Sequence, residues 1–320
     1  MILVVGGLAD TVTELVCARL DDCGYPYRLL DLGFYPAGFE VSCHWRDSSV
    51  SGYVAGPDWK LDVDEIGAVY ARYLGMDGRA APPDVPPEWV PAMYFEYDSG
   101  LMAMLDGLPC TVVNRIAGGM SNSSKAYQAL LVRECGLLTP PTLVTNDPEA
   151  VRGFADEFDG NVVYKSLSGI RSIVRRLQPD QVARLPLLRH GPAQFQAFIP
   201  GENVRVHTVG EHVFAHVVHS EAVDYRYGSR EGHEVAMEPA ALPADVECAC
   251  LDLAGRLDLL LAGIDLKRTP DGDYYCFEIN PSPGFLYYEQ QTRQPISAAV
   301  ADLLQNGVRP SAREGAMPPR

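Results

Sequence analysis

The sequence predicts an α/β protein in three parts: an N-terminal domain built on a parallel sheet and two α+β lobes. Three observations predict this class. The chain opens with an apolar run, a Gly6-Gly7 turn, an amphipathic helical pattern and a second apolar run, which is typical of a β-α-β unit. The second half carries several short β-branched runs and one amphipathic helix. The 320 residues, 47% of them hydrophobic, suffice for about two or three compact units.

The N-terminal domain is expected over residues 1–115. Within it, the proline-rich connector at 80–91 should lack regular structure, because a residue before proline is driven out of the helical region. The elements expected from apolar periodicity are helices over 10–20 and 96–105 and strands over 1–5, 27–31, 41–45, 52–54, 68–72 and 111–114.

Small residues at 118–125, GGMSNSSK, follow the expected domain boundary. We expect a central lobe over 116–200, a C-terminal lobe over 201–308 and a flexible polar tail over 309–320. The central lobe should hold a helix over 126–135 and strands over 161–165 and 194–198. The C-terminal lobe should hold strands over 204–209 and 212–219, a helix over 248–261 and a hairpin with arms 263–268 and 273–279.

The composition narrows the function. A net charge of −16 argues against nucleic-acid and anionic-membrane partners, because the long-range field repels phosphates. The eight cysteines form no C-x-x-C pair and no zinc-type spacing, which favours reduced thiols in a cytoplasmic protein. The chain shows no basic leader and no run of eighteen apolar residues, so neither export nor membrane insertion is expected.

A candidate metal site lies in the stretch CFEINPSPGF at 276–285. Glu278 and Asn280 are two residues apart in an expected strand, so both side chains point to one side. If the hairpin arms pair around Asp271-Gly272, Asp265 falls opposite Glu278. Three oxygen-bearing side chains would then suit Mg²⁺. The alternative is a solvated hairpin face.

Two lysines are candidate phosphate ligands. Lys125 follows SNSS and precedes a helix, and Lys165 follows a strand and precedes SLSG. A lysine beside a loop with accessible backbone N–H groups can hold a phosphate. The Walker pattern is absent from the sequence. The alternative for each lysine is an ordinary surface residue.

The segment QAFIPGENVRV at 196–206 is expected to form a strand, a Pro200-Gly201 turn and a second strand. Its strand end could contact a purine edge, and the planar fork of Arg205 suits a transferred phosphoryl group. The alternative is a plain hairpin with an arginine at its rim. Four histidines follow, and we interpret them as structural or rim residues: His207, His212, His216 and His219.

In their order along the chain, these features resemble the ATP-grasp superfamily, above all the glutathione synthetase and RimK-type ligases that join a carboxylate to an amine. The resemblance covers roughly residues 116–305. It implies an ATP-grasp fold in which the last two lobes clamp Mg·ATP, behind an N-terminal pre-ATP-grasp domain. It also implies that ATP activates a carboxylate as an acyl-phosphate, which an amine then attacks.

The resemblance also implies residue roles. Lys125 and Lys165 are similar to the phosphate-binding lysines, and Arg205 and Lys165 would act in catalysis. The loop 166–169, with Ser168 and Gly169, resembles a short form of the loop that closes over the phosphates. The implied adenine hinge is Gln196, Phe198 and Ile199, the implied ribose ligand is Asn203 or Glu202, and the implied magnesium ligands are Asp265, Glu278 and Asn280.

Two departures from the family pattern stand out. The phosphate loop in KSLSGIRS is shorter and poorer in glycine than is common, and Asn203 stands where the family commonly has an aspartate.

Four residues are candidates for binding the substrate. They are Arg171, Arg226, Ser282 and Gly284, although the arginines could equally balance neighbouring acidic residues. The segments KSLSGIRSIVR, DYRY and FEINPSPGF look more like graspetide-type ligases, which modify ribosomally made peptides, than like tripeptide synthetases. The expected partners are a peptide or small carboxylate and an amine acceptor, and a homo-oligomer is left open.

Three other functions are compatible with parts of the sequence. One is a ligase that adds a free amino acid to a small acid or protein. Another is a non-catalytic nucleotide-binding module, whose mark would be a lost metal ligand or phosphate lysine. The third, a dinucleotide-binding unit suggested by VVGGLAD, lacks the G-x-G-x-x-G pattern.

Overall fold

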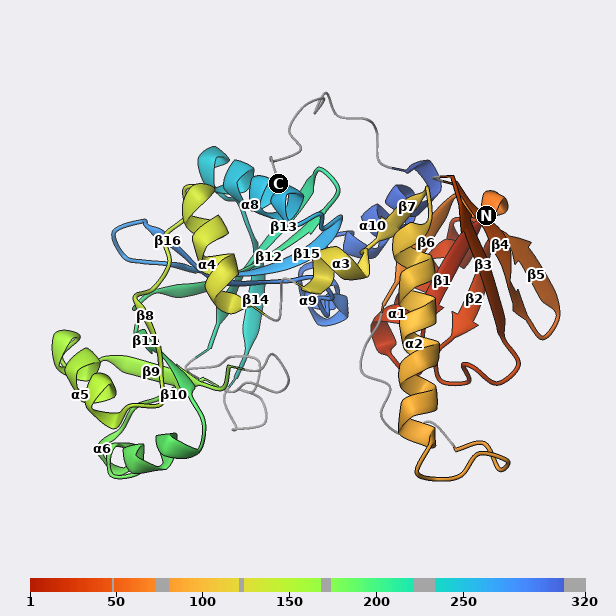
Figure 1. The fold of residues 1–320 in the computed structure, drawn as a ribbon. Helices are drawn as coiled ribbons and strands as arrows, with labels where there is room; N and C mark the ends of the chain where they lie inside the picture. The colour runs from red at the N-terminus through yellow and green to blue at the C-terminus, as the bar shows by residue number, and fades with distance from the viewer. Residues whose placement is uncertain (48, 73–80, 121–123, 168–173, 221–233, 308–320) are drawn as a thin grey trace.

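The computed structural model describes residues 1–320 except 48, 73–80, 121–123, 168–173, 221–233 and 308–320, together with the side chain of residue 126. Figure 1 shows the N-terminal domain on one side and the two sheets of the later chain on the other. Helices α9 and α10, near the C-terminal end of the described chain, lie between them.

The N-terminal domain contains the expected parallel sheet and its β-α-β opening. The strand order is β2-β1-β6-β7, and all three pairings are parallel. The first helix begins after Asp10, whose carboxylate accepts a hydrogen bond from Thr13 N and caps the helix. The bounds are β1 Ile2–Gly6, α1 Thr11–Asp22, β2 Tyr27–Asp31, β6 Ala68–Ala71 and β7 Thr111–Val113.

A second, antiparallel sheet of three strands packs in the same domain, with the long helix α2 (Val90–Gly107) contributing to their common core. The prediction that the connector at residues 80–91 lacks regular structure is wrong for its last two residues, because α2 begins at Val90. Pro91 lies in the first turn of α2, where its missing N–H would have no helical partner in any case. The strands are β3 Glu40–Arg46, β4 Ser49–Gly56 and β5 Trp59–Asp62, followed by the 3-10 turn η1 Val63–Glu65.

The central lobe is a four-stranded antiparallel sheet in the order β10-β9-β11-β8. Helix α5 starts at Pro148 behind the capping carboxylate of Asp147 and packs against the sheet over a small apolar core. The bounds are β8 Thr142–Thr145, α5 Pro148–Glu157, β9 Val162–Lys165, β10 Arg175–Arg176, α6 Pro179–Val182, η3 Leu185–His190 and β11 Ala193–Ala197.

The C-terminal lobe is a five-stranded antiparallel sheet in the order β14-β13-β12-β15-β16. One face forms a large core with α4 (Lys125–Glu134) and α8 (Ala244–Arg256). The predicted hairpin is confirmed, with Asp265 opposite Glu278. The strands are β12 Glu202–Val209, β13 His212–His219, β14 Ala236–Ala240, β15 Leu261–Arg268 and β16 Tyr274–Asn280.

The helix expected over 248–261 is wrong at both ends. It begins earlier, because Pro243 precedes α8 and Asp245 and Glu247 lie in its first turn, where acidic groups favour a helix. It ends at Arg256, residues 257–260 form a connecting turn, and β15 begins at Leu261. A short apolar run fits a buried strand as well as a buried helix, so periodicity alone could not separate the two.

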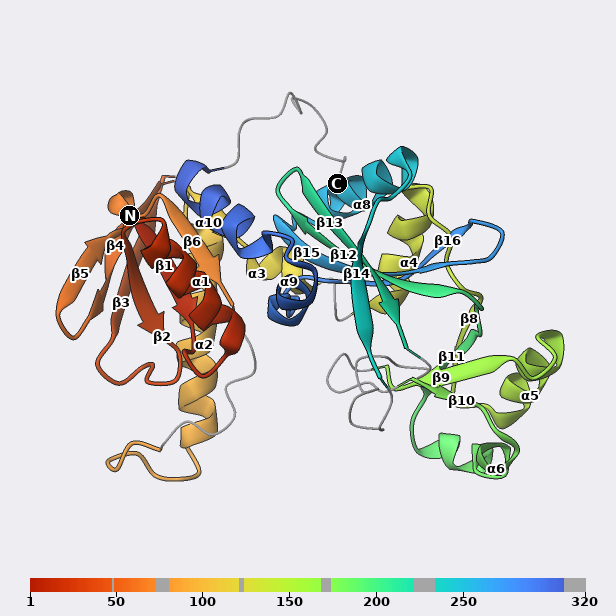
Figure 2. The same cartoon turned by 180° about the vertical axis from the view of Figure 1, so that it is seen from behind.

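The N-terminal domain and the C-terminal lobe share one apolar core. It joins residues of β1 and α1 to residues of β12, β15 and α10, and Figure 2 shows α10 beside α1. Helix α4 packs against β16 and α8, although it falls within the predicted central lobe; the domain boundaries stay a prediction. The connecting helices are α3 Ile116–Gly119, α9 Leu286–Thr292 and α10 Ile296–Asn306.

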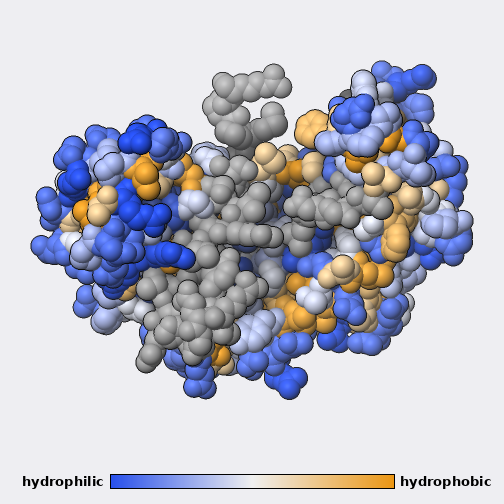
Figure 3. All heavy atoms as spheres, turned by 90° about the horizontal axis from the view of Figure 1, so that it is seen from below, coloured by the Kyte–Doolittle hydropathy of each residue, from blue (hydrophilic) through white to orange (hydrophobic). Residues whose placement is uncertain are grey.

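The surface is mostly hydrophilic over the central lobe on the face in Figure 3, and more hydrophobic residues lie on the side of the N-terminal domain. Exposed apolar side chains of that domain include Trp45, Phe95 and Tyr97. Among the described residues, no helix combines the length and apolar character needed to cross a bilayer.

Candidate active site

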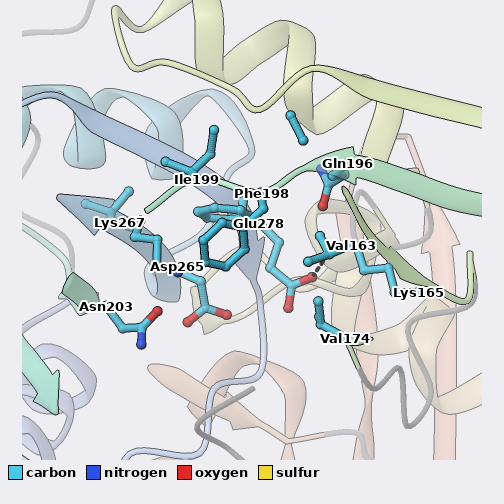
Figure 4. A pocket seen from close by; sticks show the side chains of 13 residues that line it. Val163, Lys165, Val174, Gln196, Phe198, Ile199, Asn203, Asp265, Lys267 and Glu278 are labelled. Atoms are coloured by element: carbon cyan, nitrogen blue, oxygen red, sulfur yellow. Dashed lines mark ion pairs between the residues drawn. The ribbon is translucent and has the colours of Figure 1, made fainter. Parts of the chain in front are cut away.

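A pocket opens where the central sheet meets the C-terminal sheet, and Figure 4 shows its lining. It holds about 700 Å³ of space outside the atoms, part of it open to solvent. Seven predicted site residues line it: Lys165, Gln196, Phe198, Ile199, Asn203, Asp265 and Glu278. These residues come from β9, β11, β12, β15, β16 and the link between β11 and β12.

A β-bulge in the hairpin shapes the floor of the pocket. Asp265 pairs with Glu278, but the next residue, Leu266, pairs with Cys276, so Phe277 is the extra residue. Cys276 and Ile279 are buried in the core, whereas both Phe277 and Glu278 line the pocket. The alternation of a strand would have placed Phe277 and Glu278 on opposite faces, and therefore the sequence did not predict Phe277 as a lining residue.

Glu278 is the meeting point of the two predicted phosphate lysines. Its Oε2 lies 3.5 Å from Lys125 Nζ and 3.8 Å from Lys165 Nζ, and all three side chains are at least 85% buried. Lys125 opens α4 and Lys165 ends β9, so the contact joins the C-terminal core to the central sheet. Two ammonium groups converging on one carboxylate oxygen gather positive charge at one end of the pocket, which is what a phosphate requires.

Gln128 holds the backbone beside Glu278. Its buried side-chain amide donates to Ile279 O at 2.9 Å and accepts from Ile279 N at 3.3 Å. The contact fixes the strand between Glu278 and Asn280. A glutamine on the inner side of an amphipathic helix was the available signal in the sequence, and we did not predict this role.

Arg205 is buried and pairs with the carboxylate that faces Glu278. Its Nη1 lies 2.7 Å from Asp265 Oδ1. The neighbouring strand makes room for the guanidinium at Gly263, where an added Cβ would lie 1.9 Å from Nη2. Gly263 and Asp265 are two residues apart in β15 and therefore face the same side of the sheet.

The turn after β16 is held from two sides. Asn280 Oδ1 accepts a hydrogen bond from Ser282 N at 3.0 Å, and Asn280 is not among the residues that line the pocket. Arg72 of the N-terminal domain donates to Pro283 O at 3.0 Å and to Asp10 Oδ2 at 2.6 Å. Burial raises the pKa of Asp10, but the hydrogen bond and charge of Arg72, together with the hydrogen bonds from Thr13, outweigh this, so that pKa is below its usual value.

Asn114 also binds this turn through hydrogen bonds. Its amide nitrogen donates to Pro281 O at 2.6 Å and to Leu261 O at 2.5 Å. Its oxygen accepts from the backbone N–H groups of Leu260 and Leu261 at 2.7 and 3.0 Å. One buried side chain thus joins the end of β7 to β15 and to the turn. In the turn itself, Ser282 is half-buried and Gly284 is exposed.

The predicted adenine hinge has several contacts within the protein. Gln196 Nε2 lies 3.0 Å from Thr142 Oγ1, and Phe198 N donates to Asn161 O at 2.8 Å. The Phe198 ring lies 3.4 Å from the Arg176 guanidinium carbon and 5.0 Å from Lys267 Nζ, measured to the ring centroid.

Lys267 lines the pocket and was not predicted. Burial and the positive charge of Arg176 lower the pKa of its ammonium group. Its place two residues after Asp265 in β15 was the signal, because both side chains then face the same side of the sheet.

The two ribose candidates differ in position. Asn203 lines the pocket, whereas Glu202 is about half exposed and pairs with Arg268, whose Nε lies 3.0 Å from Glu202 Oε2. Consecutive residues of β12 point to opposite faces, which explains the difference.

Four of the predicted site residues lie outside the described residues: Ser168, Gly169, Arg171 and Arg226. Within the described part of the chain, no group of three or more histidine, cysteine, aspartate or glutamate side chains could hold a metal ion. Asp265 and Glu278 supply two carboxylates, so a cation here would depend also on amide oxygens and on the ligand.

Comparison with known proteins gives a consistent picture. A family model described as the RimK-like ATP-grasp domain matches residues 122–304. The structure resembles the macrocyclase MdnC from Microcystis aeruginosa, bound with precursor peptide MdnA (27% identity, 96% of this chain, 100% of that chain, TM-score 0.83). It also resembles the ATP-grasp ligase PsnB, complexed with a phosphomimetic variant of its minimal precursor, Mg and ADP (26% identity, 96% of this chain, 98% of that chain, TM-score 0.80).

A curated relative, D-alanine–D-alanine ligase of Francisella philomiragia, is 28% identical over 160 residues, or 47% of this chain. The chain spans about half the length of that relative, 53%.

Proposed function

The chain belongs to the RimK-like ATP-grasp family, and from that membership we propose that it is an ATP-dependent carboxylate–amine ligase acting on a peptide. The observation that carries the proposal is the convergence of Lys125, Lys165 and Glu278 at one pocket. A protein with net charge −16 repels phosphates at long range, whereas two lysines that share one carboxylate here leave local positive charge that favours an anionic ligand. The triphosphate of ATP is such a ligand.

We assign Mg·ATP to this pocket, with the adenine at the hinge, the ribose at Asn203, and the phosphates at Lys125, Lys165 and Arg205. The Phe198 N–H already serves the fold, so the base contacts fall to the rest of the hinge. The oxygens of Asp265, Glu278 and Asn280 would hold Mg²⁺, which usually takes one or two carboxylates and completes its shell with water and phosphate. Magnesium supplies charge neutralisation at the phosphates.

The chemistry needs positioning more than a protein nucleophile. A substrate carboxylate oxygen attacks the γ-phosphorus, the bond to the β-phosphate oxygen breaks, and ADP leaves. The amine nitrogen then attacks the acyl carbon, phosphate leaves, and the amine loses a proton. Arg205 and Lys165 hold the negative charge that develops on the transferred group, and their burial strengthens this effect.

A peptide is the preferred carboxylate substrate. The structural relatives MdnC and PsnB were solved with precursor peptides, and the resemblance to them spans 96% of this chain. The amine acceptor would then be a side chain of the same peptide. The exposed residue Gly284 follows Pro283, which lies close to Gly263 and Arg205, and we infer that a substrate would approach from this side.

The test is a mass measurement on short acidic peptides that carry lysine, incubated with the protein and Mg·ATP. Each intramolecular amide lowers the peptide mass by one water, and one ADP should form for each amide bond. Arg205→Met should abolish both signals, whereas Arg189→Met, an exposed arginine in η3, should not. Unchanged peptide masses across a panel that varies the spacing of glutamate and lysine would count against a peptide-crosslinking ligase.

A second candidate is a ligase that joins a free amino acid to another acid, favoured by the likeness to D-alanine–D-alanine ligase. It predicts a mass gain of one amino-acid residue when free amino acids are supplied. The same instrument separates the two candidates, because one loses water and the other gains a residue. A non-catalytic nucleotide-binding module would bind Mg·ATP and change neither mass.

A further inference from the structure

Two buried histidines lie directly behind Arg205. Arg205 and His207 are two residues apart in β12, so they share the face of the sheet that meets the pocket, and His216 of β13 pairs directly with Arg205. Both histidines are fully buried. The two other histidines of this strand pair, His212 and His219, are exposed. His207 and His216 are therefore buried neighbours of Arg205 and not surface residues.

The hydrogen bonds in this group run in one direction. Arg205 Nε lies 3.4 Å from His207 Nε2, and a guanidinium can only donate, so His207 Nε2 is the acceptor. The proton of His207 is then on Nδ1, which lies 3.3 Å from His216 Nε2. His216 Nε2 accepts in turn, and its own proton is on Nδ1. One arginine thus sets the tautomers of both rings.

Both rings are neutral in this arrangement. Burial lowers the pKa of His207 far below its usual value, and the positive charge of Arg205 and the neighbouring His216 act in the same direction, against a hydrogen bond with the Gly284 backbone. Burial and the charge of Arg205 lower the pKa of His216 to about 4. Neutrality matters because a protonated His207 could not accept from Arg205.

Packing closes the group from water. The Tyr288 ring lies 4.8 Å from the His207 ring and 5.3 Å from the His216 ring, between centroids, and the Arg205 guanidinium carbon lies 5.8 Å from the Tyr288 ring. Phe285 covers His207 from another side. Rotation of the guanidinium is restricted at both edges, by Asp265 on Nη1 and by His207 on Nε.

Stability alone does not explain the histidines. Among the described residues His216 Nδ1 is buried without a hydrogen-bond partner, and such a group destabilises a fold. Two apolar side chains of similar size would avoid that cost. Their absence points to a role for the polar pair, and the only charged group that the pair contacts within the described chain is Arg205.

We propose that His207 is a positioning residue, supported by His216, which fixes the fork of Arg205 so that it meets the terminal phosphate of the nucleotide. The proposal rests on the assignment of Arg205 to the transferred phosphoryl group made under the proposed function. On that assignment a triphosphate would reach the fork and a diphosphate would not. The histidine pair should therefore affect the choice between the two nucleotides more than the affinity for either base or ribose.

The test compares dissociation constants for Mg·AMPPNP and Mg·ADP by calorimetry on the full chain. His207→Phe keeps an aromatic ring and removes the acceptor, so the preference for AMPPNP over ADP should fall by about tenfold while ADP affinity is unchanged. His207→Gln, whose side-chain oxygen can take the place of Nε2, should restore most of the preference. His212→Phe, at an exposed histidine of the same hairpin, is the matched control and should behave as wild type.

The outcomes distinguish a positioning role of His207 from a purely structural one. A wild-type preference in folded His207→Phe overturns the proposal, and so does a parallel loss of AMPPNP and ADP affinity with a lowered melting temperature, which marks a purely structural role. Should His207→Phe not fold, His216→Leu replaces it and should lower the preference in the same direction. A wild-type protein that binds neither nucleotide overturns the proposed function itself, and with it this inference.

Discussion

Gly263 leaves the space that the guanidinium of Arg205 occupies, since a Cβ at Gly263 would lie 1.9 Å from Arg205 Nη2 and 2.7 Å from Pro283 Cβ. The glycine is therefore required by the arginine and by the turn beside it. Neither the local backbone nor the apolar pattern of β15 explains it, because its φ is not in the left-handed region and its neighbours are buried. Gly263 is therefore a glycine because the site needs space at this position of the strand.

Gly263→Ala should displace Arg205 and lower ADP formation with an accepted peptide by about a hundredfold, the scale of a misplaced catalytic group. Both the buried Arg205 side chain and Pro283, whose Cβ would lie 2.7 Å from the added Cβ, must shift, so the melting temperature should also fall, and turnover is compared on the folded protein. Gly153→Ala is the control, since nothing lies within 4 Å of a Cβ there and alanine favours the helix α5. Wild-type turnover in folded Gly263→Ala would contradict the required fit.

Gln128→Leu should destabilise the protein by about 2–4 kcal/mol, because a buried N–H and a buried C=O of Ile279 lose their partners. Urea unfolding measures the change. Turnover should also fall in the folded fraction, since Glu278 precedes Ile279. Gln290→Leu, at an exposed position in α9, should change neither quantity. If Gln128→Leu loses no more unfolding free energy than Gln290→Leu, the hydrogen bonds of Gln128 to Ile279 do not stabilise the strand as described.

Acid should weaken the ion pair between Asp10 and Arg72, the arginine that donates to the turn at Pro283 O. Because the pKa of Asp10 in the folded protein is below the usual 3.8, its ionised form adds stability above that pH, and this contribution is lost as the pH falls through the lower folded value. The difference in unfolding free energy between wild type and Asp10→Asn should thus be constant from pH 7 to about 5 and shrink below pH 3.8.

Asp58→Asn, at an exposed carboxylate, serves as the control for this pH series and should show no comparable change. A difference for Asp10→Asn that grows as the pH falls would have the wrong sign for the Asp10–Arg72 pair.

Asn203→Ala should weaken Mg·ATP binding by about tenfold, as the loss of a buried hydrogen bond to the ribose predicts. The variant should also lose the preference for ATP over its deoxyribose analogues, because on the proposed assignment the Asn203 side chain would contact the ribose hydroxyl groups. Glu202→Ala is the matched control one residue away, on the opposite face of β12. A loss of ribose discrimination in Glu202→Ala alone would reverse the assignment.

Local sequence patterns predicted the main secondary elements of the site. The β-α-β opening, the hairpin and the pairing of Asp265 with Glu278 follow from apolar periodicity and a turn at Asp271-Gly272, and the structure confirms them. The order of lysines, arginine and acidic residues led to the family, which the match over residues 122–304 confirms. The roles of the individual residues stay predictions.

What the sequence did not predict depends on contacts between distant segments. Asn114 and Arg72 reach the Pro281 and Pro283 carbonyls from more than 160 residues away, and no local pattern reports such a contact. The bulge at Phe277 breaks the alternation on which strand faces are predicted. The helix boundary at Arg256 was missed because a short apolar run suits a buried helix and a buried strand equally.

The central claim is that Glu278 and the cations around it bind Mg·ATP. The most direct measurement is the shift in unfolding temperature of wild type and Glu278→Ala with Mg·ATP, with NAD as the control ligand and Glu149→Ala, at an exposed residue of α5, as the control variant.

At one hundred times its dissociation constant a ligand stabilises a protein by roughly 2.7 kcal/mol, which is readily detected. We predict a clear shift for wild type and for Glu149→Ala with Mg·ATP, a much smaller one for folded Glu278→Ala, and none with NAD. No shift in any of the folded proteins, or an equal shift with NAD, would contradict the account.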